Sequence, residues 1–244
     1  MMAQITDSFD KYEQNDAYHW NMTDSRWNNG KYNPPTVARF QMLEDLLDDN
    51  VVKVLDIGCG DGYLLHRVGT AYPDAELYGI DTEEHAIKLA DDYLDEYRHN
   101  STLSQGSAYE LPFGAEKFDT VLMTEVIEHL EDPELALSEA NRVLRNGGTF
   151  LVTTPNQQPD IEWDPEYHVH EFTQDELEEI LERHFSDTHM KACCPMSWMR
   201  YWRSRSINRS IVRAISRLGY NPMLTLTDNP SPNFGQLLAK CVKK

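Results

Sequence analysis

Long apolar runs are missing from this 244-residue sequence, which contains no stretch of about 18 apolar residues such as a membrane-spanning helix needs. Its N-terminus also lacks the basic stretch followed by an apolar stretch that is typical of a secretory signal peptide. Because neither signal is present, the sequence predicts a cytoplasmic protein.

Cysteine is scarce as well, with four residues in the chain. Cys193 and Cys194 are adjacent, which is not a zinc-ligand spacing, and Cys59 and Cys241 each stand alone. The cysteines therefore predict neither a disulfide framework nor a structural zinc site, and we expect reduced thiols.

Basic residues are few, since 22 Lys and Arg stand against 41 Asp and Glu and give a net charge of −19. A protein that binds nucleic acid broadly needs a positive surface to match the phosphates, so this balance argues against a nucleic-acid partner. The basic residues are nevertheless unevenly spread. Residues 188–227 contain no Asp or Glu but hold Lys191, Arg200, Arg203, Arg205, Arg209, Arg213 and Arg217.

The most informative stretch is VVKVLDIGCGDG, residues 51–62. Its β-branched apolar residues are typical of a strand buried on both faces, which ends at Gly58, Gly60 and Gly62 before a helical pattern begins. Glycines at a strand-to-helix turn let the backbone approach a ligand closely, and the helix N-terminus offers unpaired N–H groups. Plain helix-to-strand packing also uses such turns, but the stretch favours a nucleotide-binding loop.

Asp56, just before this loop, distinguishes between ligands. A dinucleotide would place its pyrophosphate at the loop, where a carboxylate repels it. S-adenosylmethionine (SAM) has no phosphate, and its ammonium group is attracted to a carboxylate. The stretch resembles motif I of the class I SAM-dependent methyltransferases, and the resemblance extends over roughly residues 35 to 190.

This resemblance implies an α/β fold with a Rossmann-like, doubly wound sheet of seven strands, SAM as cofactor and S-adenosylhomocysteine (SAH) as product. The last two strands, normally joined by a tight hairpin, are separated here by a helical insertion. The aromatic N-terminal residues either pack on the core as an extension or form a lid over the cofactor. We expect a cap or lid over residues 1–36, a SAM-binding core over 37–194, a basic insertion over 195–233 and a final core strand over 234–244.

The predicted cofactor residues follow the ends of successive strands. Asp81 ends the second strand, where its carboxylate can accept both ribose hydroxyl protons, although Asp is also a good N-cap for the next helix. The resemblance places adenine near Ser107, where the family usually has Asp, and the cofactor carboxylate near Arg39. The full predicted set is Asp56, Gly58, Cys59, Gly60, Asp81, Thr82, Ser107, Ala108, Thr124 and Arg39.

The predicted chemistry lies after the fourth strand. Glu125, Glu128 and His129 stand at i, i+3 and i+4, a spacing that places them on one helix face, and His168 or His170 arrives from a later segment. Methyl transfer from a sulfonium is an in-line displacement, so the protein contributes positioning and, for a hydroxyl acceptor, a base.

Three interpretations of these residues remain open. His129 or His170, supported by Glu128, takes the acceptor proton; or Glu125, Glu128, His129 and His168 hold a divalent metal; or the acidic and imidazole groups only stabilise a turn. The resembling E-x-x-E-H string binds a metal in ubiquinone-pathway and small-RNA 2′-O-methyltransferases. Between the two catalytic interpretations, the sequence favours the metal-free base.

The insertion contains a predicted helix over residues 203–218 with arginines at every fourth position from Arg205 to Arg217 and an opposing apolar stripe of Ile207, Ile211, Ile215 and Leu218. One interpretation is contact with an anionic membrane or an anionic substrate. The other is a cap helix that buries the isoleucines and pairs its arginines with the acidic body.

These observations predict a SAM-dependent methyltransferase with a small or carrier-linked acceptor. O-methylation of a sugar, phenol or carboxylate is the favoured reaction. The alternatives are a nucleic-acid 2′-O-methyltransferase and a non-catalytic SAM-binding protein. A NAD(P)-dependent oxidoreductase is less favoured, because the loop reads G-x-G-x-G after Asp56 rather than G-x-G-x-x-G.

Overall fold

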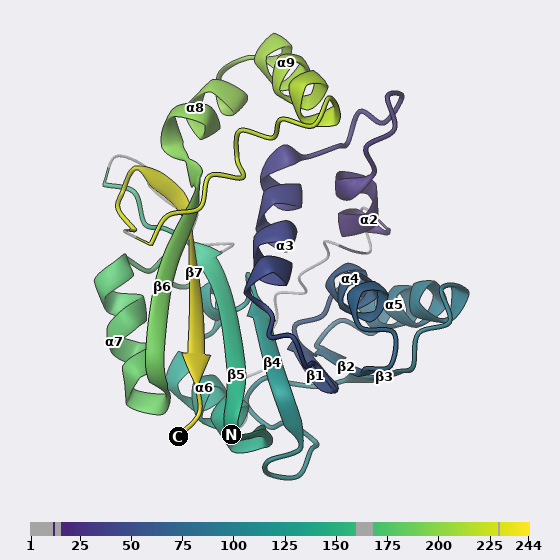
Figure 1. Cartoon of the computed structure of the whole chain (residues 1–244), viewed down its shortest axis with the longest axis vertical. Coiled ribbons are helices and arrows are strands. Elements are labelled where there is room, and N and C mark those ends of the chain that lie inside the picture. Colours follow the sequence, from purple (N-terminus) through teal and green to yellow (C-terminus); the bar gives the residue numbers. More distant parts are fainter. Residues whose placement is uncertain (1–11, 13–15, 160–167, 229) are drawn as a thin grey trace, which may run out of the picture.

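The computed structural model describes residues 12, 16–159, 168–228 and 230–244. A seven-stranded sheet forms its centre, in the order β3-β2-β1-β4-β5-β7-β6 (Figure 1). The strands are β1 (Lys53–Ile57), β2 (Glu76–Asp81), β3 (Ser101–Gln105), β4 (Phe118–Thr124), β5 (Leu144–Pro155), β6 (Ser186–Pro195) and β7 (Phe234–Val242). β1 to β5 pair in parallel, and β7 pairs antiparallel to both β5 and β6. The predicted α/β fold with seven strands is confirmed.

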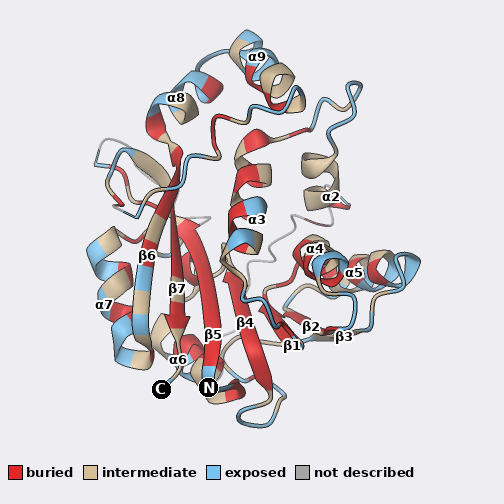
Figure 2. Cartoon of the chain, viewed as in Figure 1, coloured by how far each residue is buried: buried red, intermediate tan, exposed pale blue. Residues whose placement is uncertain are grey.

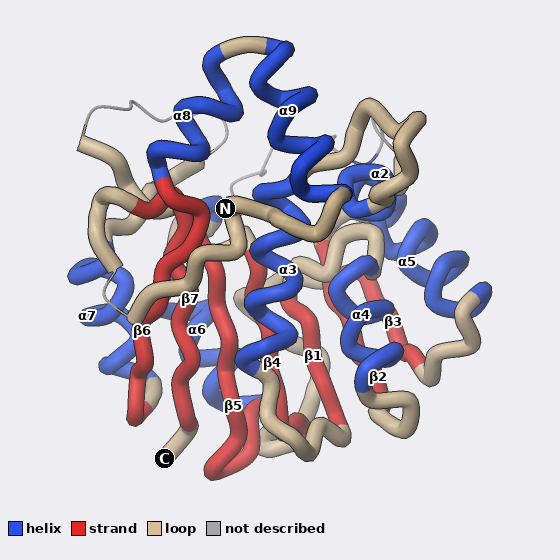
Figure 3. The backbone as a smooth tube through the Cα atoms, turned by 45° about the horizontal axis from the view of Figure 1, so that its top comes forward, coloured by secondary structure: helices blue, strands red, loops and turns tan. Residues whose placement is uncertain are grey.

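Helices cover both faces of this sheet. They are α2 (Tyr18–Thr23), α3 (Pro34–Leu46), α4 (Tyr63–Ala71), α5 (Glu84–Glu96), α6 (Pro133–Val143), α7 (Gln174–His184), α8 (Met196–Ser204) and α9 (Ser206–Arg217), with a short 3₁₀ turn η1 (Ile127–His129). Figure 3 shows α3 and α4 in front of the sheet and α6 behind it. Among the described residues, no helix is long and apolar enough to cross a membrane.

The interior strands are apolar throughout because both of their faces are covered. In β4, Val121 and Met123 pack into the cluster that contains α6 and α7, whereas Leu122 packs into the cluster that contains α3 and α4. A strand whose alternate side chains enter two different cores has a continuous apolar sequence, as is typical of a parallel sheet. Figure 2 shows the resulting buried centre.

Local capping chemistry sets the start of two helices on one face of the sheet. The Asp132 side chain accepts a hydrogen bond from Leu135 N–H and Pro133 occupies the first turn of α6. At α7, Thr173 and Glu176 form a capping box. These contacts lie within a few residues of one another, which is why the sequence alone reveals them.

The insertion differs from its prediction. The helix expected over residues 203–218 is broken at Arg205, whose backbone is extended, so that α8 and α9 form a corner. Trp202 on α8 and Val212 on α9 both pack into one buried cluster with Met42 of α3. A straight helix would carry these side chains away from one another, and the turn at Arg205 brings both to the core.

The apolar stripe of α9 is not buried as one interpretation expected. Ile207 is 61% exposed, Ile211 42% and Leu218 76%, while Val212 and Ser216 are the buried residues of this helix. Val212 and Ser216 are four positions apart, so they define a different helix face from the isoleucines. Figure 1 shows α9 above the end of the sheet where the parallel strands have their carboxyl ends. Ile207 and Ile211 are exposed on this helix, and Ile215 is half-buried.

Candidate functional site

The glycine loop between β1 and α4 is built from backbone that other residues rarely adopt. Gly58, Gly60 and Gly62 have φ values of 75°, 54° and 73°. A Cβ atom on Gly58 would lie 2.3 Å from Val126 Cγ2, and one on Gly60 would lie 1.9 Å from the Tyr12 hydroxyl. The loop therefore requires glycine at these positions for its conformation and for the close approach of neighbouring groups.

Asp81 connects this loop to the end of β2. The Gly60 N–H donates to Asp81 Oδ2 at 2.8 Å, and the Glu83 N–H donates to Asp81 Oδ1 at 2.9 Å. The N-cap of α5 is Glu83, so Asp81 lies two residues before the cap position. Carboxylate oxygens accept more than one hydrogen bond each, so the same group can also accept from a ribose hydroxyl.

Two buried polar atoms beside the loop have no hydrogen-bond partner among the described residues: Asp56 Oδ1 and Thr124 Oγ1. Asp56 is 2% exposed, and burial followed by the charge of Asp81 raises the pKa of its carboxyl well above the usual range. Buried polar atoms in proteins are normally hydrogen-bonded, so these atoms indicate the place of a polar ligand. An ammonium and a hydroxyl, both present in SAM, supply the missing partners, and the residues fit this cofactor.

The predicted adenine contacts lie at the tip of β3. The backbone N–H of Gly106 donates to the Asp81 carbonyl at 2.9 Å, which places Ser107 and Ala108 beside the end of β2. Ser107 Oγ accepts from the Tyr109 N–H at 3.2 Å. Thr82 is exposed in the turn after Asp81. Cys59, in contrast, is buried in the loop, and burial raises the pKa of its thiol.

Arg39 and Glu125 form an ion pair that the sequence did not reveal. Arg39 Nη1 donates to Glu125 Oε2 at 2.8 Å, from α3 to the turn after β4. Thr153 Oγ1 and Gln236 Nε2 also donate to Glu125 Oε1. Glu125 thus ties α3, β5 and β7 together, and its carboxylate is occupied by these three donors.

The expected common helix face for Glu125, Glu128 and His129 is wrong. Glu125 has a φ of 55°, and only Ile127–His129 form a single 3₁₀ turn. The chain reverses there, so the Glu125 carboxylate meets Arg39 while the Glu128 carboxylate accepts from Thr154 Oγ1 at 3.0 Å. Among the described residues, Glu125 is not part of the group of donor atoms that could hold a metal.

Glu128, His129 and His168 instead form a carboxylate–imidazole cluster. One donor atom from each lies within 4.8 Å of the other two, and the two imidazole rings are 5.1 Å apart. The N–H groups of Val169 and His170 donate to the Glu128 carbonyl at 2.9 and 3.1 Å, which brings the later segment to the end of β4. Burial, followed by Glu125, raises the pKa of the Glu128 carboxyl well above its usual range.

The two histidines of the later segment have different neighbours. His168 Nδ1 lies 2.9 Å from Glu171 Oε1, and its ring lies edge-on to the His129 ring. His170 packs against Phe172, and its Nε2 lies 3.8 Å from Glu176 Oε2 at the start of α7. His170 is outside the carboxylate–imidazole cluster. The polar, proline-containing linker that follows the fifth strand and extends to Tyr167 predicts a mobile loop over the site, and residues 160–167 of this linker lie outside the described part of the chain.

The N-terminal segment contributes contacts that the sequence indicated only by its richness in aromatic residues. His19 bonds Asp61 in the glycine loop twice, through its backbone N–H at 2.6 Å and its Nδ1 at 2.9 Å. Trp20 Nε1 donates to the Asp61 carbonyl at 2.9 Å, and its ring stacks on Tyr93 of α5 at 4.3 Å. The described part of the segment therefore packs on the glycine loop itself.

This docking predicts that Trp20→Ala lowers the free energy of unfolding by about 2 kcal/mol, since removing a half-buried indole costs less than the full loss for a core Trp. Trp27→Ala is the matched control because Trp27 is 65% exposed, and we expect a change within about 0.5 kcal/mol. Urea unfolding followed by circular dichroism measures both. Equal losses in the two variants would show that α2 does not depend on the Trp20 stack.

Comparisons with known proteins agree with this geometry. The sequence profile of the family described as "Methyltransferase domain" matches residues 48–201, more than half of the chain. The ubiquinone biosynthesis O-methyltransferase of Azorhizobium caulinodans is 37% identical over 109 residues, which are 43% of this chain and 41% of that protein. The enzyme of the same name from Alkalilimnicola ehrlichii is 28% identical over 192 residues, which are 75% of this chain and 71% of that protein.

Solved structures share the fold. A SAM-dependent methyltransferase from Thermotoga maritima, described as a possible histamine N-methyltransferase, aligns with a TM-score of 0.65 at 18% identity and covers 96% of this chain and 95% of its own. Phosphoethanolamine N-methyltransferase 2 of Haemonchus contortus, crystallised with SAM, aligns with a TM-score of 0.67 at 17% identity over 99% of this chain and 61% of its own. Together with the glycine loop and its two carboxylates, the family match shows that this chain belongs to the class I SAM-dependent methyltransferases.

Proposed function

We propose that this protein transfers the methyl group of SAM to an oxygen atom of a small or carrier-linked acceptor. The observation that carries the choice of oxygen is the carboxylate–imidazole cluster of Glu128, His129 and His168. A hydroxyl loses its proton when it attacks a methyl group, and an imidazole beside a buried carboxyl can take that proton. The matched relatives named O-methyltransferases support the same reaction.

In this proposal the cofactor lies across the carboxyl ends of β1, β2 and β4. Asp81 accepts from the ribose hydroxyls, and Asp56 faces the ammonium group, whose positive charge opposes the burial that raises the pKa of this carboxyl. Gly58 and Gly60 allow the backbone to approach the ligand. The remaining proposed contacts are Cys59, Thr82, Ser107, Ala108, Thr124 and Arg39. Bound SAM supplies a methyl group on a positively charged sulfur.

The protein's own groups then handle the acceptor proton. His129 is the proposed base, because it is half-buried at the end of β4 with its Nε2 4.0 Å from Glu128 Oε1. Glu171 holds the His168 ring through Nδ1 and thereby fixes its orientation toward His129. His170 is the alternative base, with less support because its ring lies against Phe172 and Glu176.

A divalent cation is the second candidate, favoured by one specific observation. The donor atoms of Glu128, His129 and His168 converge within 4.8 Å, and the His168 ring also contacts the Glu171 carboxylate, the kind of neighbour that metal-binding histidines usually have. A cation held by these three residues would acidify an acceptor hydroxyl. It would also favour the ionised form of Glu128, opposing the burial that raises the pKa of this carboxyl.

One experiment tests the reaction and separates the two candidates. The purified protein is incubated with methyl-labelled SAM and a panel of phenol, sugar, carboxylic acid and amine acceptors, with and without EDTA. We expect label on an oxygen acceptor, at a rate that EDTA changes by less than about twofold if a metal-free base carries the reaction. Loss of activity in EDTA and recovery with Mg²⁺, Mn²⁺ or Zn²⁺ would establish the cation, and label on amines alone would overturn O-methylation.

A further inference from the structure

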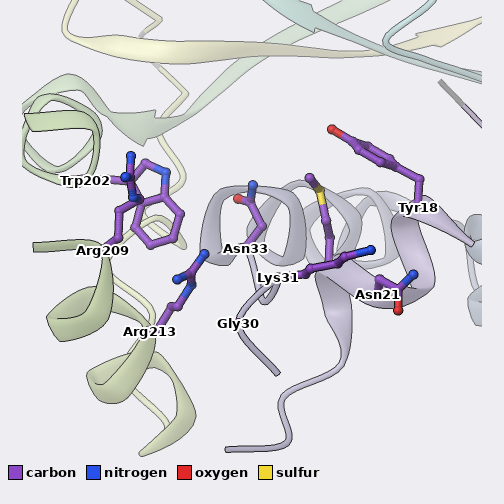
Figure 4. Close-up of a pocket in the computed structure, with 9 residues that line it drawn as sticks. Tyr18, Asn21, Gly30, Lys31, Asn33, Trp202, Arg209 and Arg213 are labelled. Atoms are coloured by element: carbon purple, nitrogen blue, oxygen red, sulfur yellow. The ribbon is translucent and has the colours of Figure 1, made fainter. Parts of the chain in front are cut away.

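A second pocket, separate from the glycine loop and from the carboxylate–imidazole cluster, lies between the N-terminal segment and the insertion. Its volume is about 420 Å³. Figure 4 shows Trp202, Arg209 and Arg213 on the insertion side and Asn33, Lys31 and Tyr18 on the opposite side. We call this the cap pocket. It is formed by two segments at least 169 positions apart in the sequence.

The cap pocket is positively charged in a strongly acidic protein. Three cationic side chains line it, Lys31, Arg209 and Arg213, and no Asp or Glu is among its lining residues. Within the described part of the chain, neither the Lys31 ammonium nor the Arg209 guanidinium has an ion-pair partner. The whole chain has a net charge of −19, so a pocket lined by cations and by no carboxylate departs from its overall composition. Such a concentration of one charge attracts the opposite one.

Arg213 is held in place by contacts that do not neutralise it. Its Nε donates to the Tyr32 carbonyl at 2.7 Å, and its guanidinium lies 5.2 Å from the Trp202 ring centre. Burial, followed by Arg217 and Arg209, lowers the pKa of Arg213, which shows that like charges crowd this helix face. A fixed guanidinium with unneutralised neighbours is suited to bind a phosphate or carboxylate.

Two other cations of the basic segment, Lys191 and Arg217, have contacts of their own. Lys191 pairs with Asp228, and Arg217 donates to the Asn29 carbonyl at 2.6 Å while its guanidinium lies 4.9 Å from the Tyr32 ring centre. The cap pocket differs from these two places, because its cations line one cavity that no carboxylate lines.

The cap pocket is also within reach of the proposed reaction. Asn33, which lines it, is the N-cap of α3, and Arg39 lies six positions further along this helix. At a rise of 1.5 Å per residue this separation is about 9 Å. Arg39 contacts Glu125 in the turn that leads to Glu128 and His129. Helix α3 therefore connects the cap pocket to the turn after β4 that carries the proposed base.

We propose that the cap pocket binds an anionic group of the methyl acceptor, with a phosphomonoester preferred over a carboxylate because three cations face it. This inference rests on the proposed methyl transfer and adds a class of substrate to it.

The test uses the full chain and three probes of similar size: phenyl phosphate, phenylacetate and benzyl alcohol. Isothermal titration calorimetry measures their binding to the wild type, to the double variant Lys31→Gln/Arg209→Gln and to Arg205→Gln. Arg205 is the matched control, since it is exposed one turn before Arg209 and does not line the cap pocket. We expect phenyl phosphate to bind most tightly, the double variant to lose at least about tenfold in affinity and the control to stay within about twofold.

Three results would overturn the inference: equal binding of benzyl alcohol, an equal loss in Arg205→Gln, or binding to phosphatidylglycerol vesicles without binding of phenyl phosphate, which would identify a membrane instead. Titration of SAH into the same samples separates this inference from the proposed function. Both variants should bind SAH as the wild type does. Failure of the wild type to bind SAH would contradict the methyltransferase proposal, whereas loss of phosphate binding alone concerns only the cap pocket.

Discussion

We expect Asp81→Ala to weaken the binding of SAH by at least about 100-fold, because the ligand loses the charged acceptor of its hydrogen bonds. The carboxylate has two functions here that alanine cannot replace. It is the proposed acceptor for the ribose hydroxyls, and it holds the glycine loop through the Gly60 N–H at 2.8 Å. Isothermal titration calorimetry with SAH measures the loss directly.

Glu84→Ala is the control for this prediction. Glu84 lies three residues after Asp81, is exposed and pairs with Lys88 on the surface of α5, so its removal should leave SAH affinity within about twofold. Thermal unfolding of both variants shows whether the Asp81 protein remains folded, with an expected loss of about 1–2 kcal/mol from the broken backbone contacts. Wild-type affinity in Asp81→Ala would remove this residue from the cofactor site, and tight NADH binding would contradict the phosphate-free assignment.

His129→Ala lowers the turnover of an oxygen acceptor by about 10²- to 10⁴-fold, the usual contribution of a general base, while SAH affinity stays unchanged. The base must be unprotonated to act, so wild-type turnover rises with pH as the imidazole loses its proton. Removing the imidazole removes this pH dependence. Steady-state kinetics between pH 5 and 9, with labelled SAM, measure both effects.

His170→Ala is the matched control, since it also lacks an imidazole near the end of β4 but lies outside the carboxylate–imidazole cluster. We expect its turnover to fall by less than about tenfold. A larger loss in His170→Ala than in His129→Ala would move the base to His170. Unchanged turnover in both variants would exclude a histidine base and leave positioning of the acceptor as the main contribution of the protein.

Much of the fold follows from local chemistry that the sequence displays. The apolar run before Gly58 predicts β1, and Asp132 and the pair Thr173 and Glu176 predict the starts of α6 and α7. Each of these signals depends on residues that are neighbours in the chain. Helix caps, glycine turns and apolar periodicity act over a few residues, so they can be recognised without the tertiary structure.

The candidate site could be predicted from such local signals only in part. The spacing of Glu125, Glu128 and His129 suggested one helix face, but the chain reverses at Glu125 and sends its carboxylate to Arg39, 86 positions earlier. The expected ion pairs of the α9 arginines are likewise absent among the described residues, where Arg213 and Arg217 contact carbonyl groups of the N-terminal segment. Spacing predicts which residues are near in a regular helix, not where that helix ends.

By itself the sequence determined the class of the protein: a glycine loop, a carboxylate before it and a second carboxylate after the next strand. These features can be recognised without the tertiary structure, because the ends of adjacent parallel strands meet at one edge of a sheet whatever surrounds them. Only the tertiary structure decided that His168 rather than His170 joins Glu128 and His129, and that Lys31 faces Arg209 across one pocket. Those contacts join segments far apart in the chain, and their formation depends on how the N-terminal segment, the turn after β4 and the insertion pack together.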